Sequence, residues 1–209
     1  MAQGKRVYRS PLRAEQARRT RAAVLDAAER CFAERGYAAA TMKDVAAQAG
    51  VAVQTVFSQG SKASLLLACV DRAVVGDDED DALLAREPFV RLRESEELDA
   101  KLAAWRQLAR TYAGRVVPAM KVFADAAASD PEIEAAYVDY EQRRFEDVRA
   151  LLAAFEPWLR DGVDVDGAAE VVWAVFGHVS ADNLMRVRGW SVEQYADFIV
   201  DAVERLLLT

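Results

Sequence analysis

Apolar residues recur every three or four positions along almost the whole chain, and this period constrains the fold more than any other feature. The first stripe, between positions 16 and 35, consists of Val24, Leu25, Ala28, Cys31 and Phe32. Such spacing places the side chains on one face of an α-helix. Only 10 glycines and 5 prolines interrupt the 209 residues, and alanine is abundant, which further favours helices. The sequence therefore predicts an all-α protein.

Composition narrows the class of protein. Hydrophobic residues make up 53% and charged residues 29% of the chain, which is typical of a folded globular protein. No apolar run approaches the roughly 20 residues of a membrane span. The basic N-terminus is not followed by the apolar segment of a secretory signal. We therefore expect a cytoplasmic protein without a membrane partner.

The sequence contains few of the residue combinations that catalysis requires. The single histidine, His178, excludes a multi-histidine metal site, and no phosphate-binding loop or nucleophile with a partnered base stands out. Cys31 and Cys69 lie in apolar helical segments without the spacing of a metal or redox pair, so we interpret them as buried, reduced thiols. The sequence predicts no metal, no cofactor and no enzyme.

Charge is distributed unevenly along the chain. Residues 1–62 contain 11 Lys and Arg against 5 Asp and Glu, whereas residues 63–209 contain 16 against 29. A basic head on an acidic body indicates that the first part meets a polyanion. We expect a flexible basic arm over residues 1–17, a first helical domain over 18–75 and a second over 76–209. The second domain is expected to begin with a charge-rich hinge or loop over residues 76–97.

The first domain carries the start and stop signals of short helices. Its first helix, expected to begin near Gln16, should end at Gly36, where a left-handed residue costs least. Thr41 is suited to cap the next helix, which Gly50 ends. A third short helix is predicted over residues 53–58, followed by a fourth that begins at Ser61.

The second domain shows longer helical patterns. Pro118 is predicted to break one helix, and Asp130 followed by a proline to start a long one. Residues 166–188 form a pattern that is apolar almost all round, and residues 191–208 one that is broadly apolar. Because a helix that is apolar on every side must be buried on every side, we expect this pair to pack against a second copy of the chain. Coverage by the core of a single monomer is the alternative.

Residues 46–66, AAQAGVAVQTVFSQGSKASLL, place two short apolar helices around a glycine-containing turn. This is the helix-turn-helix arrangement, whose second helix presents its N-terminal residues to base edges in the DNA major groove. Gln54 offers a donor and an acceptor together, as adenine requires, and Thr55 can bind a phosphate or a thymine methyl. Ser61 and Lys62 stand at a helix N-terminus that suits a phosphate. The candidate DNA-binding residues are Thr41, Lys43, Val53, Gln54, Thr55, Ser58, Ser61 and Lys62.

Residues 18–66 resemble the DNA-binding domain of the TetR (tetracycline repressor) family of bacterial regulators. The resemblance rests on RAAVLDAAERCFAERGYAAATMKDVAAQAGVAVQTVF followed by GSKASLL. It implies an N-terminal three-helix DNA-binding domain over residues 18–75, followed by an all-helical ligand-binding and dimerisation domain. It further implies a homodimer, an operator of two half-sites in double-stranded DNA, and a small-molecule effector whose binding releases the DNA.

Three features depart from the pattern of that family. Phe57 stands where the family usually has a tyrosine whose hydroxyl reaches a phosphate, so we expect Phe57 to serve only as core. Only Ser58 and Gln59 precede the GSK triplet, one residue fewer than usual and without a second aromatic. Ala52 replaces the serine that often caps the recognition helix.

The second domain carries aromatic and sulfur side chains that suit the lining of a pocket between helices. These candidate ligand-binding residues are Trp105, Tyr112, Met120, Phe123, Tyr137, Tyr140, Trp173 and Phe176. Such a lining predicts a lipophilic or aromatic effector, and plain core packing is the alternative for each residue. We interpret His178 and Asn183 as satisfied buried or interface polar groups and Arg144 as a solvated side chain.

The leading hypothesis is a transcriptional repressor that such an effector releases from its operator. The alternative is a regulator-like protein that has lost sequence-specific DNA binding and acts through protein pairing. The shortened segment after Phe57 is the observation that suggests this alternative. A helical enzyme with a basic appendage is a third class, for which the sequence offers no catalytic constellation.

Overall fold

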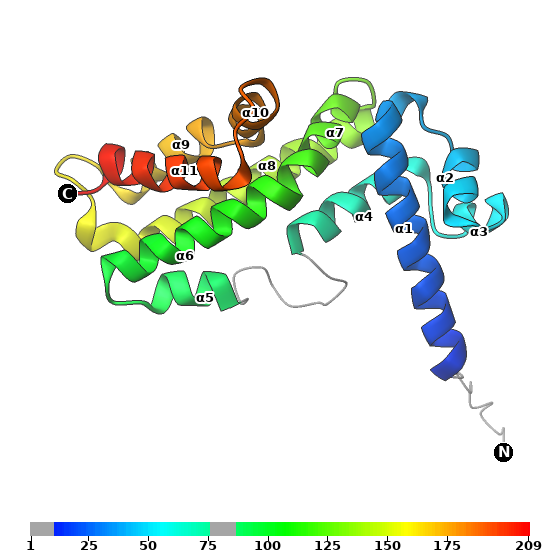
Figure 1. Ribbon diagram of the computed structural model, residues 1–209, viewed down its shortest axis with the longest axis horizontal. Coiled ribbons are helices and arrows are strands. Elements are labelled where there is room, and N and C mark those ends of the chain that lie inside the picture. The colour runs from blue at the N-terminus through cyan, green and yellow to red at the C-terminus, as the bar shows by residue number, and fades with distance from the viewer. Residues whose placement is uncertain (1–10, 76–86) are drawn as a thin grey trace, which may run out of the picture. The chain divides into compact units, whose positions relative to one another are not determined.

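The computed structural model describes residues 11–75 and 87–209, and side chains there except those of residues 11, 12, 14 and 88. These residues form helices and short connections without a strand, which confirms the all-α prediction (Figure 1). The chain divides into two compact units, Met1–Cys69 and Val70–Thr209. Within the described ranges, no helix is both long and apolar enough to cross a membrane.

The amino-terminal unit contains α1 to α3 and the first half of α4. Its elements are α1 (Pro11–Ala39), α2 (Met42–Ala49), α3 (Val53–Phe57) and α4 (Lys62–Val75). Leu25, Phe32, Val45 and Val56 are at most 2% exposed and form its core. This burial holds α1, α2 and α3 together, because apolar surface removed from water is the main stabilising term in folding.

The first helix is longer than the sequence predicted. α1 begins at Pro11 rather than near Gln16, so the part of the expected arm from residue 11 to 17 is helical, while residues 1–10 lie outside the described ranges. Proline is tolerated in a first helical turn because its missing N–H would have no partner there. Gly36 interrupts the helix with a φ of 74° and a ψ of 158°, which is where the sequence predicts the end.

The carboxy-terminal unit is a larger helical assembly. Its elements after α4 are α5 (Glu87–Glu94), α6 (Leu98–Thr111), the π-turn η2 (Tyr112–Val116), α7 (Val117–Ala127), α8 (Pro131–Leu152), the 3₁₀ segment η3 (Ala153–Trp158), α9 (Val165–Val175), α10 (His178–Asp182), the π-turn η4 (Asn183–Val187) and α11 (Val192–Leu207). α6 packs against α5 and α11, and α8 against α7 and α9 (Figure 1). The side chain of Asp130 caps α8, where the sequence predicts a helix start, and that of Ser191 caps α11.

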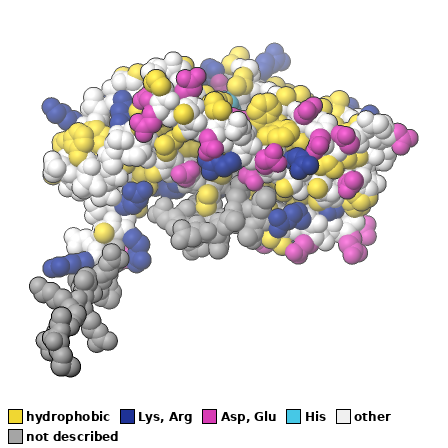
Figure 2. Space-filling view, turned by 180° about the vertical axis from the view of Figure 1, so that it is seen from behind, with side chains coloured by type: hydrophobic (Ala, Val, Ile, Leu, Met, Phe, Trp, Pro, Cys, Tyr) yellow, Lys and Arg dark blue, Asp and Glu magenta, His cyan; other side chains and the backbone are white. Residues whose placement is uncertain are grey.

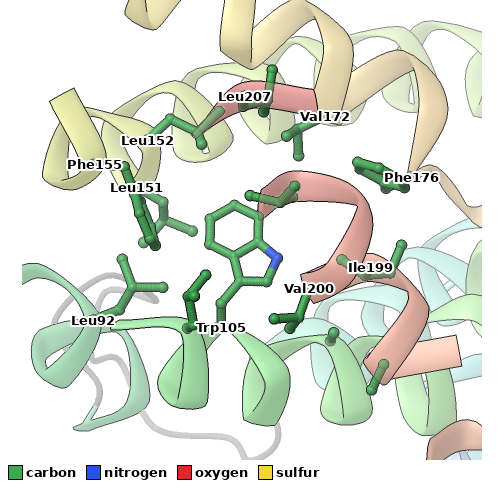
Figure 3. Packing of buried hydrophobic residues seen from close by; sticks show 14 of the residues in the cluster. Leu92, Trp105, Leu151, Leu152, Phe155, Val172, Phe176, Ile199, Val200 and Leu207 are labelled. Atoms are coloured by element: carbon green, nitrogen blue, oxygen red, sulfur yellow. The ribbon is translucent and has the colours of Figure 1, made fainter. Parts of the chain in front are cut away.

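Trp105 of α6 lies at the centre of the main core of this unit (Figure 3). Its indole meets the ring of Phe155 edge to face, with the centroids 5.6 Å apart. Side chains of α5, α8, α9 and α11 surround it, and Leu92, Leu152 and Phe155 are fully buried. The helices of the unit are therefore joined by one continuous apolar cluster.

Residues 87–94 correct the expectation of a hinge or loop over residues 76–97, of which 76–86 lie outside the described ranges. They form α5, which an ion pair of 2.8 Å between Glu87 and Arg91 spans and which Leu92 anchors in the core. The ammonium of Lys101, 3% exposed, donates to the carbonyl of Leu92 at 2.9 Å and satisfies the end of the helix. Because most residues of this segment are charged or polar, the sequence pattern does not predict that Leu92 is buried.

Two further helix limits differ from those predicted. Pro118 does not break its helix, because η2 loosens the backbone immediately before it and α7 continues with the proline in its first turn. The helix predicted over residues 166–188 is interrupted at Phe176 and Gly177, where the backbone leaves helical geometry. Val175 and Val179 flank this break and are 44% and 61% exposed, so this segment is not buried on every side within one chain.

Candidate functional site

α2 and α3 form a helix-turn-helix within the amino-terminal unit. The Thr41 hydroxyl accepts a hydrogen bond from the Asp44 amide, and the Asp44 carboxylate accepts one from the Thr41 amide at 2.9 Å. Gly50 ends α2 with a φ of 67°, a left-handed conformation that favours glycine. Ala52 precedes α3 without a side-chain cap. The helix limits predicted around the turn are thus confirmed.

α3 has one buried and one exposed face. Val56 is fully buried, Gln54 is exposed, and Val53 and Thr55 are half-buried. An accessible amide beside a hydroxyl and a methyl supplies the groups that read base edges in the major groove. The structure therefore brings Val53, Gln54 and Thr55 together at the start of one short helix.

The expectation that Phe57 serves only as core is wrong, because its side chain is 55% exposed. Successive residues of a helix point about 100° apart, so the register that buries Val56 turns Phe57 outward. An exposed ring at this place can pack on deoxyribose or on a thymine methyl. The sequence carries no clear signal for this outward orientation, because adjacent apolar residues such as Val45 and Ala46 are both buried in α2.

Thr41 and Lys43 stand at the beginning of α2. The hydroxyl of Thr41 also donates to Asp44 at 2.6 Å, and these hydrogen bonds hold the pKa of the Asp44 carboxyl below its ordinary value. Arg35 contacts the same carboxylate at 2.7 Å. Thr41 thus has a structural role in the cap, whereas Lys43 exposes its side chain to solvent.

The shortened segment between α3 and α4 closes as a tight turn. Gly60 has a φ of 138°, and a Cβ at this position would collide with the hydroxyl of Ser64. Ser58 donates to the carbonyl of Thr55 at 2.7 Å, and Ser61 accepts from the amide of Ser64 at 3.1 Å, which caps α4. The glycine at position 60 therefore allows a connection between α3 and α4 that is one residue shorter than usual.

Lys62 contacts the end of α1 rather than standing free at the start of α4. Its ammonium donates to the carbonyl of Ala38 at 3.3 Å and lies 4.4 Å from the centroid of the Tyr37 ring. A cation over an aromatic face is attracted by the ring. These contacts give Lys62 a structural role, and its contact with a phosphate stays a prediction.

Part of the candidate ligand-binding set comes together around Phe123 in the carboxy-terminal unit. The ring of Phe123 lies 5.3 Å from that of Tyr137 and 6.0 Å from that of Tyr140, both edge to face. Burial raises the pKa of the Tyr112 hydroxyl to about 12, and burial together with the nearby Tyr112 raises the pKa of Tyr140. Met120 is fully buried on the same helix as Phe123.

The other candidates lie elsewhere in the unit. Trp105 and Phe176 belong to the large core of Figure 3. Trp173 is 36% exposed, and its ring meets that of Phe145 at 6.2 Å. Their contact with an effector stays a prediction.

Arg144 is not the solvated side chain that the sequence suggested. Its side chain is 13% exposed and that of Glu141 is 12% exposed, and the two form an ion pair at 2.9 Å. Arg144 also donates to the carbonyl of Trp173 at 3.2 Å. A charge leaves water at such a cost that it is kept inside only when it is paired in this way.

His178 is buried, but it is not satisfied as expected. It is 7% exposed, and its Nδ1 makes no hydrogen bond to the described residues while lying 3.9 Å from Oε1 of Glu141. Burial lowers the pKa of the imidazole and thereby favours its uncharged form, which Glu141 opposes in part. Asn183, in contrast, is exposed.

Glu141 is the residue of this region that sequence reasoning missed. A signal was present, because Tyr137, Tyr140, Glu141 and Arg144 are spaced as i, i+3, i+4 and i+7 and therefore share one helix face. Two charged residues on an otherwise aromatic stripe indicate a buried polar contact. Its aromatic and apolar neighbours make this helix face look like ordinary hydrophobic core.

A hollow of about 280 Å³ lies at another part of the same unit. Its walls are Gly162, Val163, Asp164, Gly167, Val171, Leu206 and Leu207. None of the predicted ligand-binding residues lines it. Figure 2 shows one face of the molecule, on which apolar side chains lie in patches between acidic and basic ones.

Comparison with known proteins connects these features to a class of regulators. Residues 24–69 match the family model described as bacterial regulatory proteins, tetR family. This range contains the helix-turn-helix and most of the core of the amino-terminal unit. A comparison with curated proteins found no match.

Several solved structures share the fold over nearly the whole chain. NalD, the secondary repressor of the MexAB-OprM multidrug efflux pump in Pseudomonas aeruginosa, is 17% identical with a TM-score of 0.67, covering 93% of this chain and 98% of its own. SmeT, the repressor of a Stenotrophomonas maltophilia multidrug efflux pump, was solved with triclosan and is 19% identical with a TM-score of 0.69, covering 91% and 92%. A structure described as the molecular basis for control of antibiotic production by a bacterial hormone is 27% identical with a TM-score of 0.61, covering 96% and 100%.

The family match is confined to residues 24–69, so the amino-terminal unit is similar to the helix-turn-helix domain of tetR-family regulatory proteins. The solved structures share the helical fold of both units.

Proposed function

We propose that the protein is a homodimeric repressor that reads an operator through α3 and leaves it when an effector binds the carboxy-terminal unit. The observation that carries the DNA-reading part is the exposed face of α3, on which Gln54 stands beside Thr55 over the buried anchor Val56. Repression is supported by the likeness to NalD and SmeT, both named as repressors.

The homodimer is supported by apolar side chains near the carboxy terminus that one chain leaves in solvent. The exposed large residues of this region are Trp173, Val175, Val179, Val187, Phe198 and Leu206. Exposed apolar surface of this extent is typical of an interaction site. A symmetric pairing of α9 to α11 with the same elements of a second chain covers it and presents two DNA-reading helices to two half-sites.

For an effector to release the DNA, its site in the carboxy-terminal unit must be connected to α4. Arg115 is a candidate for this connection. Arg115 of η2 donates to the carbonyls of Ala73 and Val74 at 2.7 and 3.2 Å and so holds the carboxy-terminal end of α4. Tyr112 opens the same π-turn. An effector that displaces η2 therefore pulls on α4 through Arg115, and α4 continues into the amino-terminal unit.

The DNA-reading role is tested by selecting duplexes from a random library with the full chain and titrating the selected sequence at several salt concentrations. Gln54→Ala should weaken binding to the selected duplex by about tenfold, because a bidentate base contact is worth about 1–3 kcal/mol. Binding to a scrambled duplex should change little. Gln107→Ala removes the same side chain from an exposed position of α6 and serves as the matched control.

The alternative function, a regulator-like protein that acts through protein pairing alone, predicts a different result. The library then yields no enriched sequence, and the chain binds all duplexes with equal, weak affinity. The segment after Phe57, in which only Ser58 and Gln59 precede the GSK triplet, is the observation that favours this alternative.

A further inference from the structure

Four buried side-chain polar atoms in the described part of the carboxy-terminal unit make no hydrogen bond there. One is Nε of Arg110, and the other three are the hydroxyl of Tyr112 on η2, Oε1 of Glu141 on α8 and Nδ1 of His178 on α10. Buried polar atoms are almost always hydrogen-bonded, since leaving one unpaired costs about 1–3 kcal/mol. The last three atoms, from three elements, point to a molecule that the protein takes up here.

These atoms belong to one locality. His178 Nδ1 lies 3.9 Å from Glu141 Oε1, and the charges of Glu141 and Arg144 act on the pKa of Tyr112. The ring of Tyr137 meets that of His178 edge to face at 6.2 Å and that of Phe123 at 5.3 Å. The locality therefore combines an aromatic wall with unsatisfied polar atoms, as ligand sites usually do.

The charges here exclude an anionic head group. Oε2 of Glu141 is paired with Arg144, which leaves Oε1 as a charged acceptor without a donor. A carboxylate or phosphate would face this oxygen with like charge, and Arg144 is already engaged with Glu141 and with the Trp173 carbonyl. A hydroxyl can donate to Glu141 and accept from Tyr112 at the same time.

We propose that Tyr112, Glu141 and His178 form the polar end of the effector site and select an uncharged ligand that carries a hydroxyl group on an apolar, ring-bearing body. The hydroxyl donates to the free oxygen of Glu141 and accepts from Tyr112, and the rings of Phe123 and Tyr137 contact the body. This inference rests on the proposed effector function and names the chemistry of its ligand.

The test measures binding of small probes to the full chain by titration calorimetry, without DNA. The probes are para-alkylphenols from methyl to octyl, their methyl ethers and the corresponding benzoates. We expect the best phenol to bind at least about tenfold more tightly than its methyl ether, because the ether leaves the Glu141 oxygen unpaired, and more tightly than the benzoate. Equal binding of phenol and ether, preference for the benzoate, or no binding of any probe would overturn the proposal.

Two conservative variants separate a ligand site from a place for trapped water. Tyr112→Phe removes a hydroxyl whose contact with the His178 backbone falls short of standard hydrogen-bond geometry, so the ligand-free protein should change little in melting temperature, while phenol binding falls by about tenfold. Tyr37→Phe is the control, since it removes a tyrosine hydroxyl from the amino-terminal unit, away from the proposed subsite; it should leave phenol binding unchanged. A melting temperature lowered by Tyr112→Phe with phenol binding unaffected would mean an ordered water only and would contradict the proposal.

Release from DNA is measured separately, so that the two proposals fail in different ways. If the phenol binds as predicted but leaves the operator complex intact, the polar subsite stands and the release mechanism is wrong. If compounds without a hydroxyl release the DNA and bind better than phenols, the repressor function stands and the subsite is wrong.

Discussion

Phe57 is an exposed aromatic residue of α3, the helix that carries the proposed DNA-reading side chains. Its side chain is 55% exposed, whereas that of Val56 is fully buried, so the ring stays in contact with water unless a partner covers it. The sequence predicts core for this position because apolar residues are usually inside. The register of α3 decides otherwise, since the side chain that follows the buried Val56 points about 100° away from it.

Phe57→Tyr should strengthen DNA binding. The added hydroxyl lies at an exposed position and can donate to a phosphate oxygen, and a hydrogen bond to a charged group is worth about 1.5–3 kcal/mol. Affinity should rise by about tenfold for selected and scrambled duplexes alike, because phosphate contacts carry no sequence information. The melting temperature serves as the control and should not change. Unaltered affinity would show that the ring does not face the DNA backbone.

Gly60 makes the short α3–α4 connection possible, so Gly60→Ala should destabilise the protein. Its φ of 138° is strained for any other residue, and the new Cβ meets the Ser64 hydroxyl; we expect a loss of about 1–3 kcal/mol in the free energy of unfolding. Gly114→Ala is the matched control, because its Cβ would meet only a Val192 methyl at 4.0 Å. Urea unfolding of the two variants provides the measurement, and equal stability would contradict the proposed need for glycine.

At the level of elements, cap residues predicted helix limits well and apolar periodicity predicted them less well. Thr41, Gly50 and Asp130 each mark a helix end as expected, because their hydrogen bonds or left-handed backbone are decided locally. Pro118 is accommodated because it lies in the first turn of α7, directly after the π-turn η2, where a proline is tolerated. The apolar pattern around Pro118 does not predict this π-turn.

The sequence likewise predicted the local features of the candidate site better than the contacts between helices. Gln54 and Thr55 on the exposed side of α3 followed from the motif, since a helix-turn-helix is a local arrangement. The pairing of Glu141 with Arg144 and the approach of His178 depend on how α8 meets α10, and the periodicity of one helix does not contain this information.

α10 carries the exposed apolar surface that we assign to the dimer. Val179→Glu should shift the protein from dimer to monomer, because a charge at this 61% exposed position would be buried without a partner in the interface. We expect the dimer dissociation constant to rise at least about tenfold, as one unpaired buried charge costs several kcal/mol. Analytical ultracentrifugation of Val138→Glu, changed at a 50% exposed valine of α8, is the control. Equal dissociation of both variants would place the interface elsewhere.

At the scale of the whole molecule, the proposed function requires a connection between the amino-terminal unit, the carboxy-terminal unit and a second copy of the chain. α4 is the element that contributes to both units, and Arg115 holds its end. Sequence alone indicated the two functions through charge and motif. It could not indicate the connection, because Arg115 and Ala73 are distant in the chain and meet only after folding.

Arg115→Ala should uncouple ligand binding from DNA release. The variant loses the hydrogen bonds to the ends of α4 but keeps α3 and the polar subsite, so the separate affinities for operator and effector should stay within about twofold. The concentration of effector that releases half of the DNA should rise about tenfold, which corresponds to loss of a typical coupling free energy. Arg91→Ala, an exposed arginine of α5, is the control. Normal release by Arg115→Ala would exclude this route.

The most direct test of the central claim is to titrate the full chain against its selected operator and against the same operator with one half-site moved by about five base pairs, half a helical turn. A symmetric dimer that reads two successive major grooves cannot place both recognition helices on the altered duplex. We predict that its affinity falls to that of random DNA, with a steep salt dependence throughout. Equal affinity for the two duplexes would contradict a dimeric, sequence-reading regulator.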